Sequence, residues 1–325
     1  GNITKILSVI DTLSEMVKDY LIMSNLRKGQ SNDLQQFFSS TNSADAYRYF
    51  IYGNKAFSKG DWTSAASWYM QSIKCDSSYI PATVWLSITY LNLGLYEQGK
   101  KLCLMSYQKR DQLPIQQKIW ANLIYAGYFQ TTTDIINWTN QLIEIDDQQP
   151  LLYYILGGNY TNLKKYDEAI SAMEKSLKIY DKWDSKPYWV YNYVGLGYVY
   201  HKVGKYNEEE RLYKKAEKDF PDDPDLIYSQ AILSLTESDT IAANRYIKKL
   251  TAKLENNSAS EADIASVMAS IYSDAGILNM AEKYFRQALF FEPEKVERIY
   301  NLGFFLINND QNINEGLDLI DRALK

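Results

Sequence analysis

The sequence predicts an all-α fold made of about eight helix hairpins stacked in a continuous array. A short turn motif recurs at intervals of one or two units of roughly 34 to 40 residues, which is the period of two-helix repeats. All 7 prolines lie at or beside the expected junctions, where a missing N–H costs nothing. The motif copies are Gly60-Asp61-Trp62-Thr63, Gly94-Leu95-Tyr96, Lys164-Lys165-Tyr166, Gly204-Lys205-Tyr206 and Gly276-Ile277-Leu278.

Each unit should contain a first helix, helix A, and a second, helix B. Five units place a small residue after a large one in helix A, which lets the two helices approach closely: Gly53, Gly157, Gly197, Ala269 and Gly303. The third unit has Thr131-Thr132-Thr133 at its turn and the sixth has Glu237-Ser238-Asp239, so both are degenerate. The expected units are 46–79, 80–114, 116–149, 150–186, 190–223, 224–258, 262–295 and 296–325.

Three regions follow along the chain. Residues 1–27 space their apolar side chains three or four apart and predict one long amphipathic helix. Residues 28–43 are rich in Gly, Ser, Asn and Gln and predict a linker before the array of 44–325. The first helix is either the end of a preceding domain or a cap on the first repeat. Gly1 in place of an initiator Met suggests a cleaved tag or a fragment of a longer parent.

The fifth and seventh units carry a known pattern most fully. The fifth has Tyr193, Leu196, Gly197, Tyr200, Tyr206, Tyr213, Ala216 and Pro221, with Glu209 where Ala is usual. The seventh has Tyr272, Ala281, Phe285, Ala288 and Pro293. Over residues 44–325 the chain resembles the tetratricopeptide repeat (TPR) family. The resemblance implies a right-handed superhelix, with helix A lining a concave groove that binds proteins. Segments 46–50, 60–62 and 110–113 more weakly resemble repeat regions attached to bacterial signalling and regulatory proteins.

Composition excludes several kinds of partner. The formal net charge is −5 and there is no basic run, so we expect neither direct nucleic-acid binding nor contact with a membrane surface. Cys75 and Cys103 are too few for a disulfide framework and lack zinc-site spacing. No signal sequence is evident; a cytoplasmic location is slightly favoured, and the alternative is a periplasmic part of a membrane-anchored parent.

Catalytic chemistry has little support. His201 is the only histidine, which excludes a two-histidine metal site, and no nucleophile turn or phosphate-binding loop occurs. We interpret His201 as a polar surface residue and Glu208-Glu209-Glu210 as solvated on an outer helix. We therefore predict no catalytic residue, no cofactor and no metal, and a chain that is not an enzyme.

The leading functional hypothesis is a protein-interaction scaffold that binds a peptide or partner helix in the groove. Most of the 28 Tyr and 7 Trp should pack in the core, and a minority on helix A face the groove in the resembled family. Phe50 and Trp85 replace residues of the family's carboxylate clamp, which disfavours chaperone tails. The groove candidates are Tyr47, Phe50, Asn54, Phe57, Tyr154, Asn162, Tyr191, Tyr198, His201, Lys202, Tyr300, Phe304 and Asn308.

Two alternatives stay open at this point. The array is either a scaffold in its own right or a regulatory or sensor domain of a longer signalling protein. Alternatively, some of the groove side chains are covered by the amino-terminal helix or by a neighbouring copy of the chain and do not bind a partner. Homo-oligomerisation through the end repeats is also compatible with the sequence.

Overall fold

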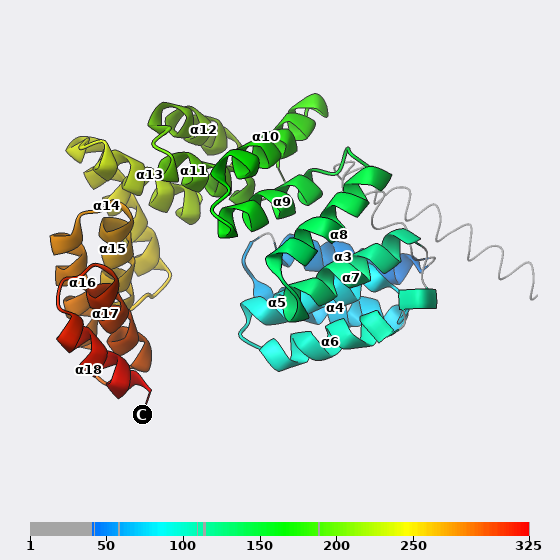
Figure 1. Ribbon diagram of the computed structural model, residues 1–325, viewed down its shortest axis with the longest axis horizontal. Helices are drawn as coiled ribbons and strands as arrows, with labels where there is room; N and C mark the ends of the chain where they lie inside the picture. Colours follow the sequence, from blue (N-terminus) through cyan, green and yellow to red (C-terminus); the bar gives the residue numbers. More distant parts are fainter. Residues whose placement is uncertain are drawn as a thin grey trace, which may run out of the picture. The chain divides into compact units, whose positions relative to one another are not determined.

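A computed structural model describes residues 41, 43–57, 59–108, 110–112, 115–187 and 189–324. Within these ranges every regular element is a helix, and no helix is both long and apolar enough to cross a membrane (Figure 1). The predicted helix of residues 1–27 and almost all of the 28–43 linker lie outside the described residues. Both therefore stay predictions.

The described helices pair into eight consecutive hairpins, which confirms the predicted all-α repeat fold. Each helix A is followed by its helix B after a short turn. In chain order the hairpins are α3 (Ala44–Phe57) with α4 (Trp62–Cys75), α5 (Ile80–Asn92) with α6 (Tyr96–Gln108), α7 (Ile115–Phe129) with α8 (Thr132–Ile145), α9 (Pro150–Asn162) with α10 (Tyr166–Lys182), α11 (Tyr191–Lys202) with α12 (Tyr206–Asp219), α13 (Pro224–Thr236) with α14 (Thr240–Asn256), α15 (Glu261–Asp274) with α16 (Leu278–Phe291), and α17 (Val296–Asn308) with α18 (Ile313–Ala323). A short 3-10 helix, Arg110–Gln112, precedes α7.

The chain divides into two compact units within α11. The N-terminal unit is Gly1–Asn192 and the C-terminal unit is Tyr193–Lys325. Inside each unit helix B of one hairpin contacts helix A of the next, as α4 does with α5 and α12 with α13. Some successive A helices also touch directly, α5 with α7 in one unit and α13 with α15 in the other. The A helices therefore share one side of each unit, which we call the helix A face.

Glycines bring the two helices of a hairpin together, as predicted. A Cβ atom built on Gly53 would lie 2.5 Å from the ring of Tyr69, and one on Gly197 would lie 2.3 Å from the hydroxyl of Tyr213. Real Cβ atoms do not approach so closely, so each position holds its partner ring against the helix backbone. Tyr69 and Tyr213 are both buried by this packing.

The turns use two kinds of local chemistry. Gly204 sits at φ 74°, and Lys164, Ser238 and Asp310 take the same left-handed region at φ 57°, 62° and 51°. The degenerate sixth turn thus keeps the backbone of the others without a glycine. The third hairpin instead begins α8 with a capping box, in which the Thr131 hydroxyl accepts from the Asp134 N–H at 3.3 Å.

Prolines mark helix starts as expected. Pro81, Pro150 and Pro224 lie in the first turn of α5, α9 and α13.

The hydrophobic cores lie between the hairpins. Phe50, Tyr69 and Tyr79 belong to the main cluster of the N-terminal unit. In the C-terminal unit Ile227, Leu250 and Ile271 belong to one cluster and Leu302 and Leu306 to another.

Candidate functional site

An aromatic pocket of about 370 Å³ opens on the helix A face of the N-terminal unit. Five A helices, α3, α5, α7, α9 and the first residue of α11, contribute to it, joined by the start of α4 and by Trp189 from the segment between α10 and α11. Its twelve lining residues are Phe57, Trp62, Val84, Trp85, Ile88, Asn92, Trp120, Leu151, Tyr154, Ile155, Trp189 and Tyr191. We call this site the aromatic pocket.

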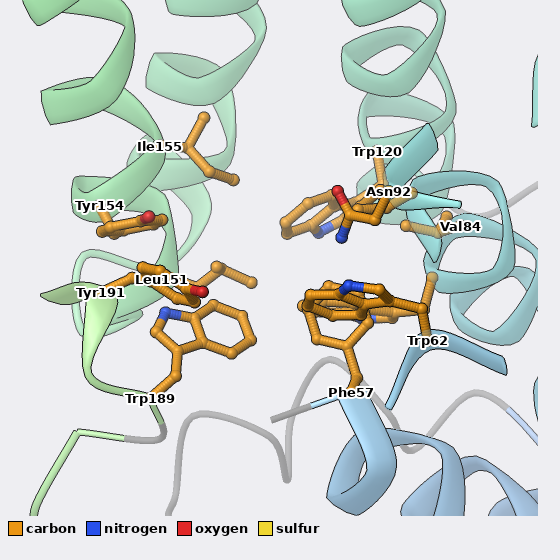
Figure 2. Close-up of a pocket in the computed structure, with 12 residues that line it drawn as sticks. Phe57, Trp62, Val84, Asn92, Trp120, Leu151, Tyr154, Ile155, Trp189 and Tyr191 are labelled. Carbon is orange, nitrogen blue, oxygen red and sulfur yellow. The ribbon is translucent and has the colours of Figure 1, made fainter. Parts of the chain in front are cut away.

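The aromatic rings form two walls. Figure 2 shows Phe57 and Trp62 on one side of the gap, facing Tyr154, Tyr191 and Trp189 on the other. Within the first wall the ring centroids of Phe57 and Trp62 are 4.7 Å apart, and Phe57 and Trp85 are 4.9 Å apart, both edge to face. This arrangement is the one that aromatic pairs prefer.

Trp189 connects the two walls, because it contacts both. Its ring centroid lies 5.6 Å from that of Trp85 and 5.9 Å from that of Phe57. On the other side it lies 6.2 Å from the ring of Tyr154. Trp189 comes from the connection before α11 and not from a helix, so the pocket depends on how that connection folds back onto the helix A face.

Among the described residues that line the aromatic pocket, none is an Asp, Glu, Lys, Arg or His. Asn92, which is exposed, supplies the one side-chain amide. Burial raises the pKa of the Tyr154 phenol, so its hydroxyl stays protonated at neutral pH. The pocket is therefore uncharged, and it favours an apolar or weakly polar group.

A second cavity, of about 440 Å³, lies on the helix A face of the C-terminal unit between α13, α15 and α17. Phe304 and Asn308 line it, and Tyr300 stacks on Phe304 with 5.7 Å between ring centroids. On the opposite side the Tyr228 hydroxyl donates to Asp274 at 2.8 Å. Burial first, and the negative charge of Asp274 second, raise the pKa of Tyr228. The cavity thus combines exposed rings, amides and one acid.

A third, small cavity of about 80 Å³ lies beside the second and is lined by Tyr198, His201, Lys202 and Glu209 among others. The Lys202 ammonium sits 5.1 Å from the centre of the Tyr198 ring, within cation–π range. His201 Nδ1 is 3.0 Å from a carboxylate oxygen of Glu209. The interpretation of His201 and Glu209 as solvated surface residues is wrong, because their side chains are only 12% and 1% exposed and are paired with each other.

The structure brings most of the predicted groove residues into these three sites. Phe57, Tyr154 and Tyr191 line the aromatic pocket; Phe304 and Asn308 line the second cavity, with Tyr300 stacked beside it; Tyr198, His201 and Lys202 line the third. Asn162 is exposed at the end of α9 and lines none of the three cavities.

Three predicted groove residues need correction. Tyr47 and Phe50 have no exposed surface and Asn54 is 3% exposed, so none offers its side chain to a partner. Phe50 packs against Tyr69 and Tyr79, and the Asn54 carbonyl oxygen accepts from the Tyr69 hydroxyl at 2.8 Å. The face of α3 that carries them is turned toward α4 and the start of α5.

Sequence reasoning missed the largest rings of the aromatic pocket, which are Trp62, Trp85, Trp120 and Trp189. The sequence did single out two of them. Trp62 lies in the turn motif, and Trp85 replaces a polar groove residue of the family pattern. Trp189 lies in a junction, where helical periodicity says nothing about contacts. No group of three His, Cys, Asp or Glu side chains in the described part of the chain is placed to hold a metal ion.

The described helices form a helical repeat protein with three cavities lined mainly by its A helices. Residues 148–221 match the family model of the tetratricopeptide repeat. The match covers the fourth and fifth hairpins, α9 to α12, which therefore carry the tetratricopeptide repeat pattern; the other described helices pair into hairpins in the same way. A search of curated proteins found no match.

Several solved structures are similar to this chain. A chain of the APC/C hetero-tetramer Cut9-Hcn1 is 14% identical with a TM-score of 0.60, over 89% of this chain and 58% of that one. Human IFIT1, solved as a dimer with PPP-AAAA, is 14% identical with a TM-score of 0.51, over 86% of this chain and 63% of that one. A tetratricopeptide repeat protein from Parabacteroides merdae is 15% identical with a TM-score of 0.45, over 86% and 99%. The chain thus spans less than two thirds of the first two proteins.

Proposed function

We propose that this chain is a non-enzymatic interaction scaffold that holds a peptide or a partner helix against its helix A face. Tetratricopeptide repeats commonly mediate protein–protein interactions, and the family match supports this class of function. The finer proposal concerns which surface is used and what it contacts.

The observation that carries the proposal is a set of large aromatic side chains left exposed beside cavities. Tyr198, Tyr300 and Phe304 are 49%, 45% and 53% exposed, and all three lie on A helices of the C-terminal unit. Rings of this kind contribute much contact area at small entropic cost when a partner covers them. The exposed amide of Asn308 lies next to them and can pair with the N–H and C=O groups of a peptide.

Two charged side chains, Lys202 and Asp274, give the proposed partner a preferred orientation. Lys202 sits beside Tyr198, and Asp274 lies between the second and third cavities, which both include it. A partner with an acidic group near Lys202 and a donor near Asp274 would match both charges. Since each charge is partly solvated, we expect these contacts to set orientation more than affinity.

Peptide selection tests the proposal. Peptides selected from a displayed library against the whole chain should lose affinity by about tenfold or more when Tyr198 and Phe304 are both changed to Ala, because two contact rings disappear. Fluorescence anisotropy with a labelled peptide measures the change.

Phe290→Ala is the matched control, since Phe290 is also aromatic and 80% exposed but lies on a B helix, α16. It should leave the affinity unchanged. Equal losses in the control and in the double variant, or no loss in either, would rule out the helix A face as the binding surface.

A further inference from the structure

The aromatic pocket of the N-terminal unit is a built site and not a gap between helices. Side chains from α3, α4, α5, α7, α9 and the start of α11 and from the connection before α11 converge on it. Its walls are already organised, because Trp189 contacts Phe57 and Trp85 on one side and Tyr154 on the other. A pocket whose rings hold one another in place needs little ordering when a ligand enters.

Size and shape limit what the pocket can take. A volume of about 370 Å³ is too small for a helix and lies near the lower end of the roughly 300–1,000 Å³ range of small-ligand sites. The space is a gap between two facing sets of rings (Figure 2). A flat group of one or two rings fits such a gap and adds to edge-to-face packing that is already present.

The chemistry of the lining selects against charge. A carboxylate entering the pocket would lose its hydration with no cation in the lining to replace it. An ammonium group would gain cation–π attraction from the tryptophans but would find no carboxylate in the lining. An uncharged aromatic ring meets neither penalty.

We infer that the aromatic pocket binds one uncharged aromatic ring, a tryptophan or phenylalanine side chain presented by a peptide held on the helix A face of the N-terminal unit. The inference rests on the proposed function and states what its partner must carry. The ring enters the gap between the two walls, and Asn92 at the rim is available to the peptide backbone.

A direct test uses a probe that is independent of any partner. Saturation-transfer NMR of the whole chain should show binding of N-acetyltryptophanamide, with much weaker transfer to N-acetylalaninamide and to tetramethylammonium. Ile155→Trp places a large ring inside the pocket and should weaken N-acetyltryptophanamide by about tenfold or more. Trp189 lies on a non-helical segment, so Trp189→Ala removes part of the pocket wall without changing a helix. This variant should also weaken the binding of N-acetyltryptophanamide.

Trp68→Ala is the control. Trp68 is 36% exposed on α4, stacks on Tyr49 at 5.8 Å and lies outside the pocket, so its loss should leave the probe's affinity unchanged. Circular dichroism verifies that each variant keeps its helices. Two variants that change the pocket in opposite ways, one filling it and one opening it, keep the test decisive when one of them fails to fold.

Two results would overturn the inference. The first is an affinity for N-acetyltryptophanamide that is the same in folded Ile155→Trp as in the unchanged chain. The second is tetramethylammonium binding at least as tightly as the aromatic probe, which would make the pocket a cation site.

A peptide cycle separates this inference from the proposed function. Changing the aromatic residue of a selected peptide to Ala should cost about tenfold against the unchanged chain and almost nothing against Ile155→Trp. If the peptide loses the same affinity against both proteins, the pocket assignment fails while the scaffold stands. If no peptide binds, the scaffold fails, and the free probe still decides whether the pocket takes a ring.

Discussion

At the scale of single residues, Glu209 departs most clearly from the repeat pattern. It stands where a small side chain is usual, and its carboxylate is buried against the A helix of its own hairpin. His201 Nδ1 lies 3.0 Å from one of its carboxylate oxygens, and the Tyr213 hydroxyl bonds to it as well. These two partners satisfy an acid that would otherwise be costly to bury.

The pH dependence of stability should report this burial. Desolvation raises the pKa of Glu209 above its ordinary value of 4.5, and hydrogen bonds from His201 and Tyr213 oppose the shift only in part. An acid with a raised folded-state pKa contributes stability below its unfolded pKa and loses it as the pH rises through the folded value. Glu209→Gln cannot titrate. The free energy of unfolding of the unchanged chain, minus that of the variant, should therefore fall as the pH rises above 4.5.

Urea denaturation of both proteins over a pH series measures this difference. The two proteins differ only at residue 209, and only the groups that touch this residue change their surroundings. The difference in the free energy of unfolding therefore reports on the buried pair of Glu209 and His201. A difference that rises with pH would mean that His201 stabilises the carboxylate more than burial disfavours it.

At the scale of the helix hairpin, two helix A glycines should respond in opposite ways to the same change. A Cβ on Gly197 would lie 2.3 to 2.5 Å from the Tyr213 side chain, whereas one on Gly158 meets nothing within 4 Å. Gly197→Ala should destabilise by about 1 to 3 kcal/mol through overpacking. Gly158→Ala should stabilise by up to about 1 kcal/mol through helix propensity. Thermal denaturation gives both signs, and two changes of the same sign would contradict the packing account.

The turn between helix A and helix B offers a second test. Lys164 takes a left-handed conformation at φ 57°, where Gly204 sits in the next hairpin at φ 74°. Lys164→Gly should stabilise by about 1 kcal/mol, because glycine carries no Cβ penalty there. Gly204→Ala should cost a similar amount. Chemical denaturation measures both, and a destabilised Lys164→Gly would show that the lysine side chain contributes more than the backbone strain.

The elements were predictable because their signals are local. Pro150 and Pro224 placed the starts of α9 and α13, and the turn motif placed the boundaries between the paired helices. Which way a helix faces was less predictable. Phe50 and Asn54 lie on one stripe of α3 that suits either a core or a groove, and only the contacts with Tyr69 decide for the core.

At the scale of the whole molecule, the site was harder to predict than the fold. The aromatic pocket joins Phe57, Trp85 and Trp189, which are far apart in the sequence and meet because the hairpins stack and a junction folds back. Periodicity reports which residues share a face of one helix, but it carries no information about a side chain on a connection. Trp189 was therefore beyond the reach of the pattern.

The division into two units predicts local rather than global responses to damage. A Cβ on Gly303 would lie 2.9 Å from the backbone oxygen of Gly316, which cannot move aside as a side chain can. Gly303→Ala should lower amide protection in α15 to α18 and leave α5 to α8 unchanged, since each repeat contacts mainly its neighbours. Hydrogen exchange followed by mass spectrometry resolves the two regions. An equal loss of protection in both would indicate one cooperative unit.

The central claim is that partners bind on the helix A face, and photo-crosslinking to a selected peptide tests it most directly. A photoreactive residue at position 304 of α17 should capture the peptide, because Phe304 lies at the second cavity. The same photoreactive residue at position 290 of α16 or at position 241 of α14 should capture little. Both positions are well exposed, since Phe290 is 80% and Ile241 is 84% exposed, but they lie on B helices. Capture from the two B helix positions with none from position 304 would contradict the account.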